Sequence, residues 1–393
     1  MMEVLKNYLN RTGHSGFIPF AVWMNAALYA PKIGYYTSTL PVGSAAAGAD
    51  FTTAPELSCV FGHTIARSIA PCLQDLAARG LPVTILECGA GTGALAAAVL
   101  DGLAGLGITP AHYNILEISP SLRAQQAQRL VGYPCVRWLD ALPASITGIV
   151  LANELLDAMP VQAYVAQAGK IYERGVVWQA TTSQWQWAQG ELAPAHSDAL
   201  WASLPSETQA AALEGAYQFE RGTQAAAWVA SAAHNLSRGA GGAMLLIDYG
   251  FAAPELYHPQ RSGGTLMAHR LHRASTDVLA HACDADITAH VDFSAVAHAA
   301  VAGGLSLAGY TNQARFLINA GVGEAFAAHT ATATVIEQAH ANRALQMLLS
   351  EAEMGELFKV IAFTHQCSAP LGFERGDRSH RLLDGLEAGS AHV

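Results

Sequence analysis

The glycine-rich turn at residues 89–93 constrains the fold of this chain more than any other stretch. It follows the short apolar run Val83–Leu86 and precedes an alanine- and leucine-rich run that begins at Ala94. The first run predicts a buried parallel strand, and the second predicts a helix packed on the same sheet. Alternating glycines carry no Cβ atoms, so a ligand can lie directly against main-chain N–H groups at the helix start. We therefore predict a nucleotide-cofactor loop.

Two acidic residues bear on which cofactor this loop binds. The loop also satisfies the loose dinucleotide pattern G-x-G-x-x-G/A, so both NAD and S-adenosylmethionine (SAM) stay open. Glu87 lies two residues before the first glycine, where its charge repels a pyrophosphate but attracts the cationic amino group of SAM. Glu117 follows the next apolar run, and an acid at this position binds ribose hydroxyls in either cofactor. Together these residues favour SAM over NAD.

The composition excludes several classes of protein. Of 393 residues, 51% are hydrophobic and 13% are charged, which allows a large core. A formal net charge of −10, without any Lys/Arg-rich run, argues against partners such as nucleic acid or an anionic membrane. The six cysteines include no C-x-x-C pair, which argues against a zinc site or a disulfide framework. Without a signal peptide or a long apolar segment, we expect a cytoplasmic protein.

The reacting end of the site is expected just after another apolar run, at residues 147–152. The segment Asn153–Pro160 follows it, and in open α/β sheets ligands gather at the carboxyl ends of the strands. Several histidines between residues 258 and 298 stand near aspartates, but only His269 and His272 could share one helical face. Because no H-x-x-x-H pair occurs among them, we predict that no metal is bound.

Several short motifs stand in one order along most of the chain. They occupy residues 20–36, 50–56, 61–62, 87–93, 117–126, 152–160, 247–250, 264–266 and 286–293. This set resembles the MidA family, also called the NADH-dehydrogenase assembly-factor methyltransferases. The resemblance implies SAM as cofactor and an α/β fold of the Rossmann-like class I methyltransferase type, with an N-terminal helical segment and inserted β/α elements.

The resemblance also implies the reaction, which is methylation of an arginine on a partner protein such as a subunit of respiratory NADH dehydrogenase. A carboxylate has to hold the guanidinium and orient one nitrogen as its proton departs. Glu154 is the first candidate, Asp157 the second and Glu56 the third. A small-molecule SAM methyltransferase and a non-catalytic SAM-binding assembly chaperone are the alternatives, and the sequence leaves open whether the chain forms a homodimer.

The expected cofactor site gathers residues from four places in the sequence. Its members are Glu87, Gly89, Ala90, Gly91, Gly93, Glu117, Ile118, Ser119, Asp140 and Asn153. Among them Asp140 is the candidate acceptor for the adenine amino group. The expected domains are an N-terminal helical cap at 1–78, a SAM-binding core at 79–165, an insertion at 166–235, the remaining core with substrate-side elements at 236–376, and a frayed tail at 377–393.

Overall fold

The computed structural model describes residues 1–38 and 53–382, which form two compact units. Among these residues, unit 1 holds 1–38, 156–226 and 251–292, and unit 2 holds 53–155, 227–250 and 293–382. Each unit is assembled from three segments of the chain. Both sides of the expected boundary at 78/79 fall inside unit 2, and the five expected domains stay a prediction about how the chain is organised. The motif residues 50–52 and the tail from 383 onward lie outside the described residues.

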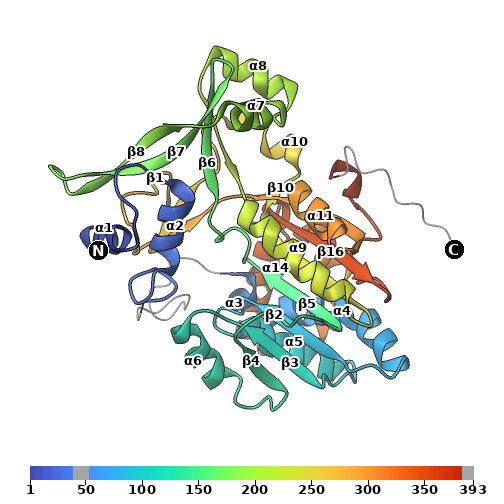
Figure 1. Ribbon diagram of the computed structural model, residues 1–393. Helices are drawn as coiled ribbons and strands as arrows, with labels where there is room; N and C mark the ends of the chain where they lie inside the picture. Colours follow the sequence, from blue (N-terminus) through green and yellow to red (C-terminus); the bar gives the residue numbers. More distant parts are fainter. Residues whose placement is uncertain (39–52, 383–393) are drawn as a thin grey trace. The chain divides into compact units, whose positions relative to one another are not determined.

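Unit 2 is built on a mainly parallel sheet (Figure 1). Its strands lie side by side in the order β15-β16-β10-β5-β2-β3-β4. They are β2 (Thr84–Cys88), β3 (His112–Leu116), β4 (Val136–Leu139), β5 (Gly148–Asn153), β10 (Gly242–Phe251), β15 (Ser306–Asn312) and β16 (Phe358–His365). Within this order only β16 runs against its neighbours. The α/β fold with a parallel sheet, predicted from the glycine turn and its neighbouring runs, is confirmed.

Helices pack on both faces of this sheet because its strands are apolar on both sides. Ile85, Ile149 and Leu245 belong to one buried cluster, which also contains side chains of α4 (Cys59–Ala78), α5 (Ala94–Gly105), α12 (Gln313–Asn319) and α13 (Val322–Thr330). Side chains alternate along a strand, so the intervening residues face α9 (Thr223–Ser237) and α11 (Phe293–Ala302) on the opposite side (Figure 1). The remaining helices of unit 2 are α3 (Ala54–Leu57), α6 (Pro120–Arg129), α14 (Val335–Leu349), α15 (Met354–Leu357) and the short η2 (Ser379–Arg381).

Unit 1 contains an antiparallel sheet with strand order β1-β7-β6-β9, in which β8 also pairs with β7. These strands are β1 (Ile18–Pro19), β6 (Gln162–Gln167), β7 (Lys170–Gln179), β8 (Gln184–Glu191) and β9 (Tyr217–Arg221). The alternation of residue types from Lys170 to Trp187 predicts a β-hairpin or small sheet, and the antiparallel β7–β8 pair confirms it. A smaller sheet has the order β12-β11-β13. The other elements of the unit are α1 (Met2–Arg11), α2 (Phe20–Tyr29), α7 (Pro194–Ala202), α8 (Ser206–Glu214), α10 (Ala253–Leu256), η1 (Pro259–Arg261), β11 (Met267–Arg270), β12 (Arg273–Ser275), β13 (Asp286–Thr288) and β14 (Val291–Asp292).

Three local predictions differ from the structure in their bounds. The sequence also predicts a helix from Leu57 to about Ala78, and α4 confirms it except that it starts at Cys59, because Ser58 is extended and its Oγ accepts the N–H of Val60 as the N-cap. The alanine-rich segment 220–238 predicts a further helix, which starts at Thr223 instead of Glu220 because residues 217–221 pair with β6.

The third difference concerns the chain end. Residues 377–382 are not frayed, because Asp377 accepts the backbone N–H of Tyr310 at 2.9 Å and Leu382 is buried. None of the helices in residues 1–38 and 53–382 has both the length and the apolar character of a membrane span.

Candidate cofactor and active site

The glycine turn joins β2 to α5 at the carboxyl end of the unit 2 sheet. Gly89, Gly91 and Gly93 all have positive φ values, and Gly93 is the N-cap of α5. The N–H of Gly89 continues the sheet by donating to the carbonyl of Leu116 at 3.0 Å. A Cβ atom at Gly91 would have no described atom within 4 Å. The main chain at Gly91 is therefore open to a ligand, as the sequence predicts.

Glu87 is the penultimate residue of β2, just before this loop, and it is buried. Its Oε2 accepts the hydroxyl proton of Tyr113 on the neighbouring strand at 2.7 Å. Burial raises the pKa of Glu87 to about 7, the hydrogen bond from Tyr113 lowers it, and the nearby Glu117 raises it. A carboxyl group in this setting ionises readily when a cation approaches, which suits recognition of an amino group.

Glu117 follows β3 and is also buried. Its Oε1 accepts the N–H of Ser119 at 2.9 Å, and its Oε2 accepts an amide proton of Gln126 at 3.1 Å. Burial raises the pKa of Glu117, whereas these two hydrogen bonds, a third from the backbone N–H of Ile118 and the charge of Arg123 oppose the rise. The carboxylate is thus held in one orientation at the end of its strand.

The other expected cofactor residues near β3 and β4 differ in exposure. Ile118 is 64% exposed, Ala90 is buried, and Ser119 is buried as the N-cap of α6. Ile118 therefore presents an exposed apolar surface beside the buried acid Glu117. Asp140 follows β4 and is exposed, and its Oδ1 forms an ion pair with Nη1 of Arg123 at 2.7 Å.

Asn153 and Glu154 stand where β5 ends, beside the glycine turn. Asn153 Nδ2 donates to Glu154 Oε1 at 3.0 Å, while Asn153 Oδ1 is buried and finds no hydrogen-bond partner among the described residues. Glu154 has a φ of 51° and its N–H donates to the carbonyl of Ile247 at 2.9 Å. A non-glycine residue in the left-handed region costs about 1–3 kcal/mol and is typical of functional sites.

Glu56 lies on the opposite flank of the glycine turn. Its Oε1 forms an ion pair with Arg129 on α6 at 2.9 Å and accepts the hydroxyl proton of Thr92. Arg129 also donates to the Thr92 hydroxyl. These contacts tie α3 and α6 to the loop, so Glu56 is engaged in holding the loop within unit 2.

Asp157 belongs to unit 1, where it is buried. From the sequence, Asp157 could instead be the N-cap of a helix, but no helix begins there, so that interpretation is wrong. Its carbonyl accepts the N–H of Ala289 at 3.0 Å, and its charge helps to raise the pKa of Tyr36. The main cause of that rise is burial, followed by Asp286, which accepts the Tyr36 hydroxyl at 2.9 Å.

An open groove lined by Trp23, Tyr35 and Tyr36 would favour a peptide substrate. Trp23 is fully buried and Tyr35 is 7% exposed, so neither can line an open groove. Trp23 instead packs with Phe20 and Trp185 in the core of unit 1. The aromatic segment at residues 18–36 therefore serves mainly as core, and its aromatic density alone does not identify a substrate surface.

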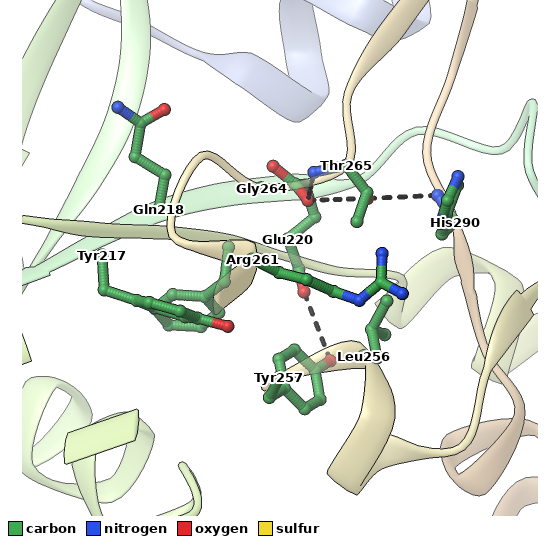
Figure 2. Close-up of a pocket in the computed structure, with 10 residues that line it drawn as sticks. Tyr217, Gln218, Glu220, Leu256, Tyr257, Arg261, Gly264, Thr265 and His290 are labelled. Atoms are coloured by element: carbon green, nitrogen blue, oxygen red, sulfur yellow. Dashed lines mark hydrogen bonds between the residues drawn. The ribbon is translucent and has the colours of Figure 1, made fainter. Parts of the chain in front are cut away.

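Unit 1 also contains a small pocket beside Glu220 (Figure 2). Glu220 Oε2 accepts both the N–H and the hydroxyl proton of Thr265, each at 2.8 Å, and the Thr265 hydroxyl accepts the N–H of His290 at 3.2 Å. The motif Gly264–Leu266 is thus held by a buried acid. For residues 286–292 the sequence predicts a hydrogen-bonded loop beside the active cleft. Asp286 and Asp292 do accept hydrogen bonds, but these residues form β13 and β14 as well as a loop, and their place beside the cleft stays a prediction.

One polar residue at the centre of the site is absent from the predicted site residues. Gln126 on α6 is fully buried, and its side chain contacts the glycine turn, Glu117 and Trp138. Helical spacing was the available signal, because Gln126 lies four residues from both Leu122 and Leu130 on the buried face. In the described parts of the chain, no group of three or more His, Cys, Asp or Glu side chains could hold a metal ion.

The arrangement fits the chemical groups of SAM. Glu87 on β2 and Glu117 just after the neighbouring β3 are buried near the glycine turn, and the unpartnered Asn153 oxygen lies at the end of β5, the next strand on the other side of β2. The strand order reverses direction between β2 and β5, and such a switch point is where open α/β sheets bind ligands. One acid suits ribose hydroxyls, and the other acid and the amide oxygen suit an ammonium group.

Comparison with known proteins adds three findings. A family model described as S-adenosyl-L-methionine-dependent methyltransferase matches residues 64–311. Curated relatives include proteins named protein arginine methyltransferase NDUFAF7, mitochondrial, from Danio rerio (26% identical; 91% of this chain and 86% of the relative) and its homologue from Drosophila melanogaster (28% identical; 88% and 82%). A crystal structure of a Burkholderia thailandensis protein bound to S-adenosyl-homocysteine is 42% identical, with a TM-score of 0.84 and coverage of 96% of this chain and 95% of that chain.

Proposed function

Because this chain belongs to the family of S-adenosyl-L-methionine-dependent methyltransferases, we propose that it transfers a methyl group to an arginine side chain of a partner protein. The observation that carries the proposal is the convergence of Glu87, Glu117 and Asn153 on the glycine turn at the carboxyl edge of the sheet. The names of the curated relatives support arginine as the acceptor.

Each cofactor residue receives a role from its position. SAM supplies a methyl group already activated by a positively charged sulfur. Glu117 accepts hydrogen bonds from the ribose hydroxyls. Ile118 covers the adenine ring, and Asp140 accepts a hydrogen bond from the adenine amino group. Glu87 and the Asn153 oxygen bind the ammonium end. The main chain of Gly89, Ala90, Gly91 and Gly93 forms the floor, and Ser119 keeps Glu117 in place.

Glu154 is our choice for the residue that handles the acceptor. A guanidinium stays protonated in water, so it can donate to a carboxylate but has to lose a proton when one nitrogen gains a methyl group. The N–H of Glu154 fixes its main chain on Ile247, and the Asn153 amide, which donates to the carboxylate, limits the orientations of the side chain. Asp157 is the second candidate. Glu56 is bound to Arg129 and Thr92, and we assign it to holding the loop rather than to proton transfer.

The partner in this proposal is a protein, with a subunit of respiratory NADH dehydrogenase as the first candidate because of the resemblance to assembly-factor methyltransferases. The named relatives are mitochondrial proteins, whereas our expectation for this chain is the cytoplasm. Whether two copies of the chain associate is a separate question, which sedimentation of the purified protein answers.

The cofactor is tested by calorimetric titration with S-adenosyl-homocysteine and, separately, with NADH. Gly91→Ala is compared with Gly107→Ala, because both glycines have positive φ and open space where a Cβ would lie. Each substitution should cost about 1–2 kcal/mol of backbone energy. Only Gly91→Ala should weaken S-adenosyl-homocysteine binding, by about tenfold or more, since only its Cβ would meet the ligand. Tighter binding of NADH by the unmodified chain would overturn the assignment.

The acceptor is tested by incubating the chain with SAM and candidate subunits and mapping methylated residues by mass spectrometry. Glu154→Gln should lower the rate of arginine methylation by at least about a hundredfold with S-adenosyl-homocysteine affinity unchanged, as expected for loss of a proton acceptor. Glu207→Gln, an exposed position on α8, is the matched control. Methylation of a small molecule, or binding of the partner without any methylation, would replace the proposal with one of the two alternatives.

A further inference from the structure

The side chain of Gln126 uses its amide to join three parts of unit 2. Nε2 donates to the carbonyl of Gly91 at 2.8 Å and to Glu117 Oε2 at 3.1 Å. Oε1 accepts the indole N–H of Trp138 on β4 at 2.8 Å. The side chain is fully buried, so water does not compete for these contacts. One residue on α6 therefore connects the glycine turn, the acid after β3 and the strand β4.

The chemistry of the three partners fixes which way the amide points. The indole of Trp138 can only donate, so the amide oxygen has to face it. The two amide protons then face the Gly91 carbonyl and the Glu117 carboxylate, both of which can only accept. Two donors thus meet two acceptors, and rotating the amide by half a turn would break all three contacts.

We propose that Gln126 is a positioning residue that makes the cofactor site selective for ribose hydroxyls, because it holds the Glu117 carboxylate in the orientation that accepts from them. This inference rests on the proposed function, in which Glu117 binds the ribose. Ser119 already binds the other carboxylate oxygen, so the pair of donors fixes the plane of the carboxylate. With its plane fixed, the carboxylate presents its remaining lone pairs in constant directions.

The same amide also determines the course of the glycine turn. Gly91 has a φ of 52°, and its carbonyl is held by Gln126. Because a peptide unit is planar, holding this carbonyl makes the N–H of Thr92 point the opposite way. The loop and the ribose acid are therefore set relative to each other by one side chain, and Gln126 needs no contact with the ligand to influence binding.

Replacing Gln126 would remove a hydrogen bond to Glu117, whose carboxylate also interacts with neighbouring charges of both signs. Glu87 on β2 repels Glu117, and Arg123 on α6 attracts it. A methionine at position 126 has the length of glutamine but offers no protons, so Glu117 would lose its side-chain donor and keep only the backbone N–H groups of Ile118 and Ser119. The carboxylate could then rotate, and its hydrogen bonds to two adjacent hydroxyls would no longer be prearranged.

The test compares affinities for S-adenosyl-homocysteine and for its 2′,3′-dideoxyribose analogue by calorimetry. The ratio of the two affinities isolates the ribose contact, because general damage to the loop weakens both ligands alike. We expect Gln126→Met to reduce this ratio about tenfold, as for loss of a hydrogen bond to a charged group. Gln128→Met, an exposed position on the same helix, should leave the ratio unchanged. Glu117→Gln provides the reference for a site that has lost its ribose acid.

The outcomes separate the role of Gln126 from the proposed function. An unchanged ratio in a folded Gln126→Met variant, alongside a reduced ratio in Glu117→Gln, would overturn the role of Gln126 and leave the proposed function standing. Failure of the unmodified chain to bind S-adenosyl-homocysteine would overturn the proposed function itself. Should the methionine variant not fold, Gln126→Asn replaces it, since the shorter amide cannot reach both acceptors, and the same fall in the ratio is expected. A wild-type ratio in the asparagine variant would also overturn the inference.

Discussion

At the scale of single residues, Glu87 makes a prediction about pH. Its pKa rises on folding from 4.5 to about 7, so the folded chain holds this proton more tightly than the unfolded chain. Between these values the unfolded state releases the proton first. The free energy of unfolding therefore falls as the pH rises, by up to about 3 kcal/mol, and levels off above about pH 7.

The variant Glu87→Gln removes this titration and retains an acceptor for Tyr113. Urea unfolding at several pH values from about 5 to 8 should show the variant gaining stability relative to the parent as the pH rises. The comparison is a difference between two chains, so titration of Glu117, whose pKa is also raised by burial, largely cancels. Parallel stability curves for the two chains would contradict the assignment of a buried, protonated Glu87.

At the scale of elements, the crossing of α4 and α5 depends on small side chains. A Cβ at Gly102 would come within 2.8 Å of the Ala66 Cβ and 2.9 Å of the His63 Cα, whereas a Cβ at Gly105 would meet nothing within 4 Å. Gly102→Ala should lower the free energy of unfolding by about 1–3 kcal/mol through overpacking. Gly105→Ala, in the same helix, should raise it by up to about 1 kcal/mol through helix propensity. Equal effects in chemical denaturation would show that the helices do not approach this closely.

The segment after β16 is another element whose attachment can be measured. Asp377 Oδ1 accepts the N–H of Tyr310, which is a buried residue of β15, and the N–H and hydroxyl of Ser379. Asp377→Ala should cost about 1–3 kcal/mol, because a buried donor loses its acceptor. Asp377→Asn retains an amide oxygen and should cost less than half as much. A melting temperature unchanged in the alanine variant would mean that the segment is not held by this residue.

At the scale of the whole molecule, net charge favours a basic partner. The chain carries a formal charge of −10, so it attracts a peptide with several arginines. Dissolved salt screens this attraction and shortens its range. Raising the ionic strength from about 0.1 M to about 1 M reduces the screening length from about 10 Å to about 3 Å. We expect kcat/KM for such a peptide to fall several-fold, while calorimetric affinity for S-adenosyl-homocysteine changes less than about twofold. A rate that is independent of salt would argue against electrostatic attraction of the substrate.

Local patterns were sufficient for much of the fold and for part of the site. The apolar runs before Gly89, Glu117 and Asn153 predicted three parallel strands, because a buried strand needs an uninterrupted apolar stretch and little else. Each of these residues follows or ends its strand. The carboxyl ends of parallel strands lie at one edge of a sheet, so the sequence was enough to predict that the three residues lie close together. The roles of these residues toward the cofactor stay predictions that the titrations above test.

Only the tertiary structure decided which polar groups are partners. Gln126 and Gly91 are 35 residues apart in the sequence, and Glu56 and Arg129 are 73 apart. Such contacts depend on how α3 and α6 pack beside the loop, and no periodicity in either segment specifies them. The same reason explains Trp23, whose aromatic character was plain from the sequence but whose complete burial includes packing against the distant Trp185. The sequence by itself thus determined strands, turn and the edge where the site lies, because these follow from neighbouring residues, while long-range packing decided the hydrogen bonds that orient the acids.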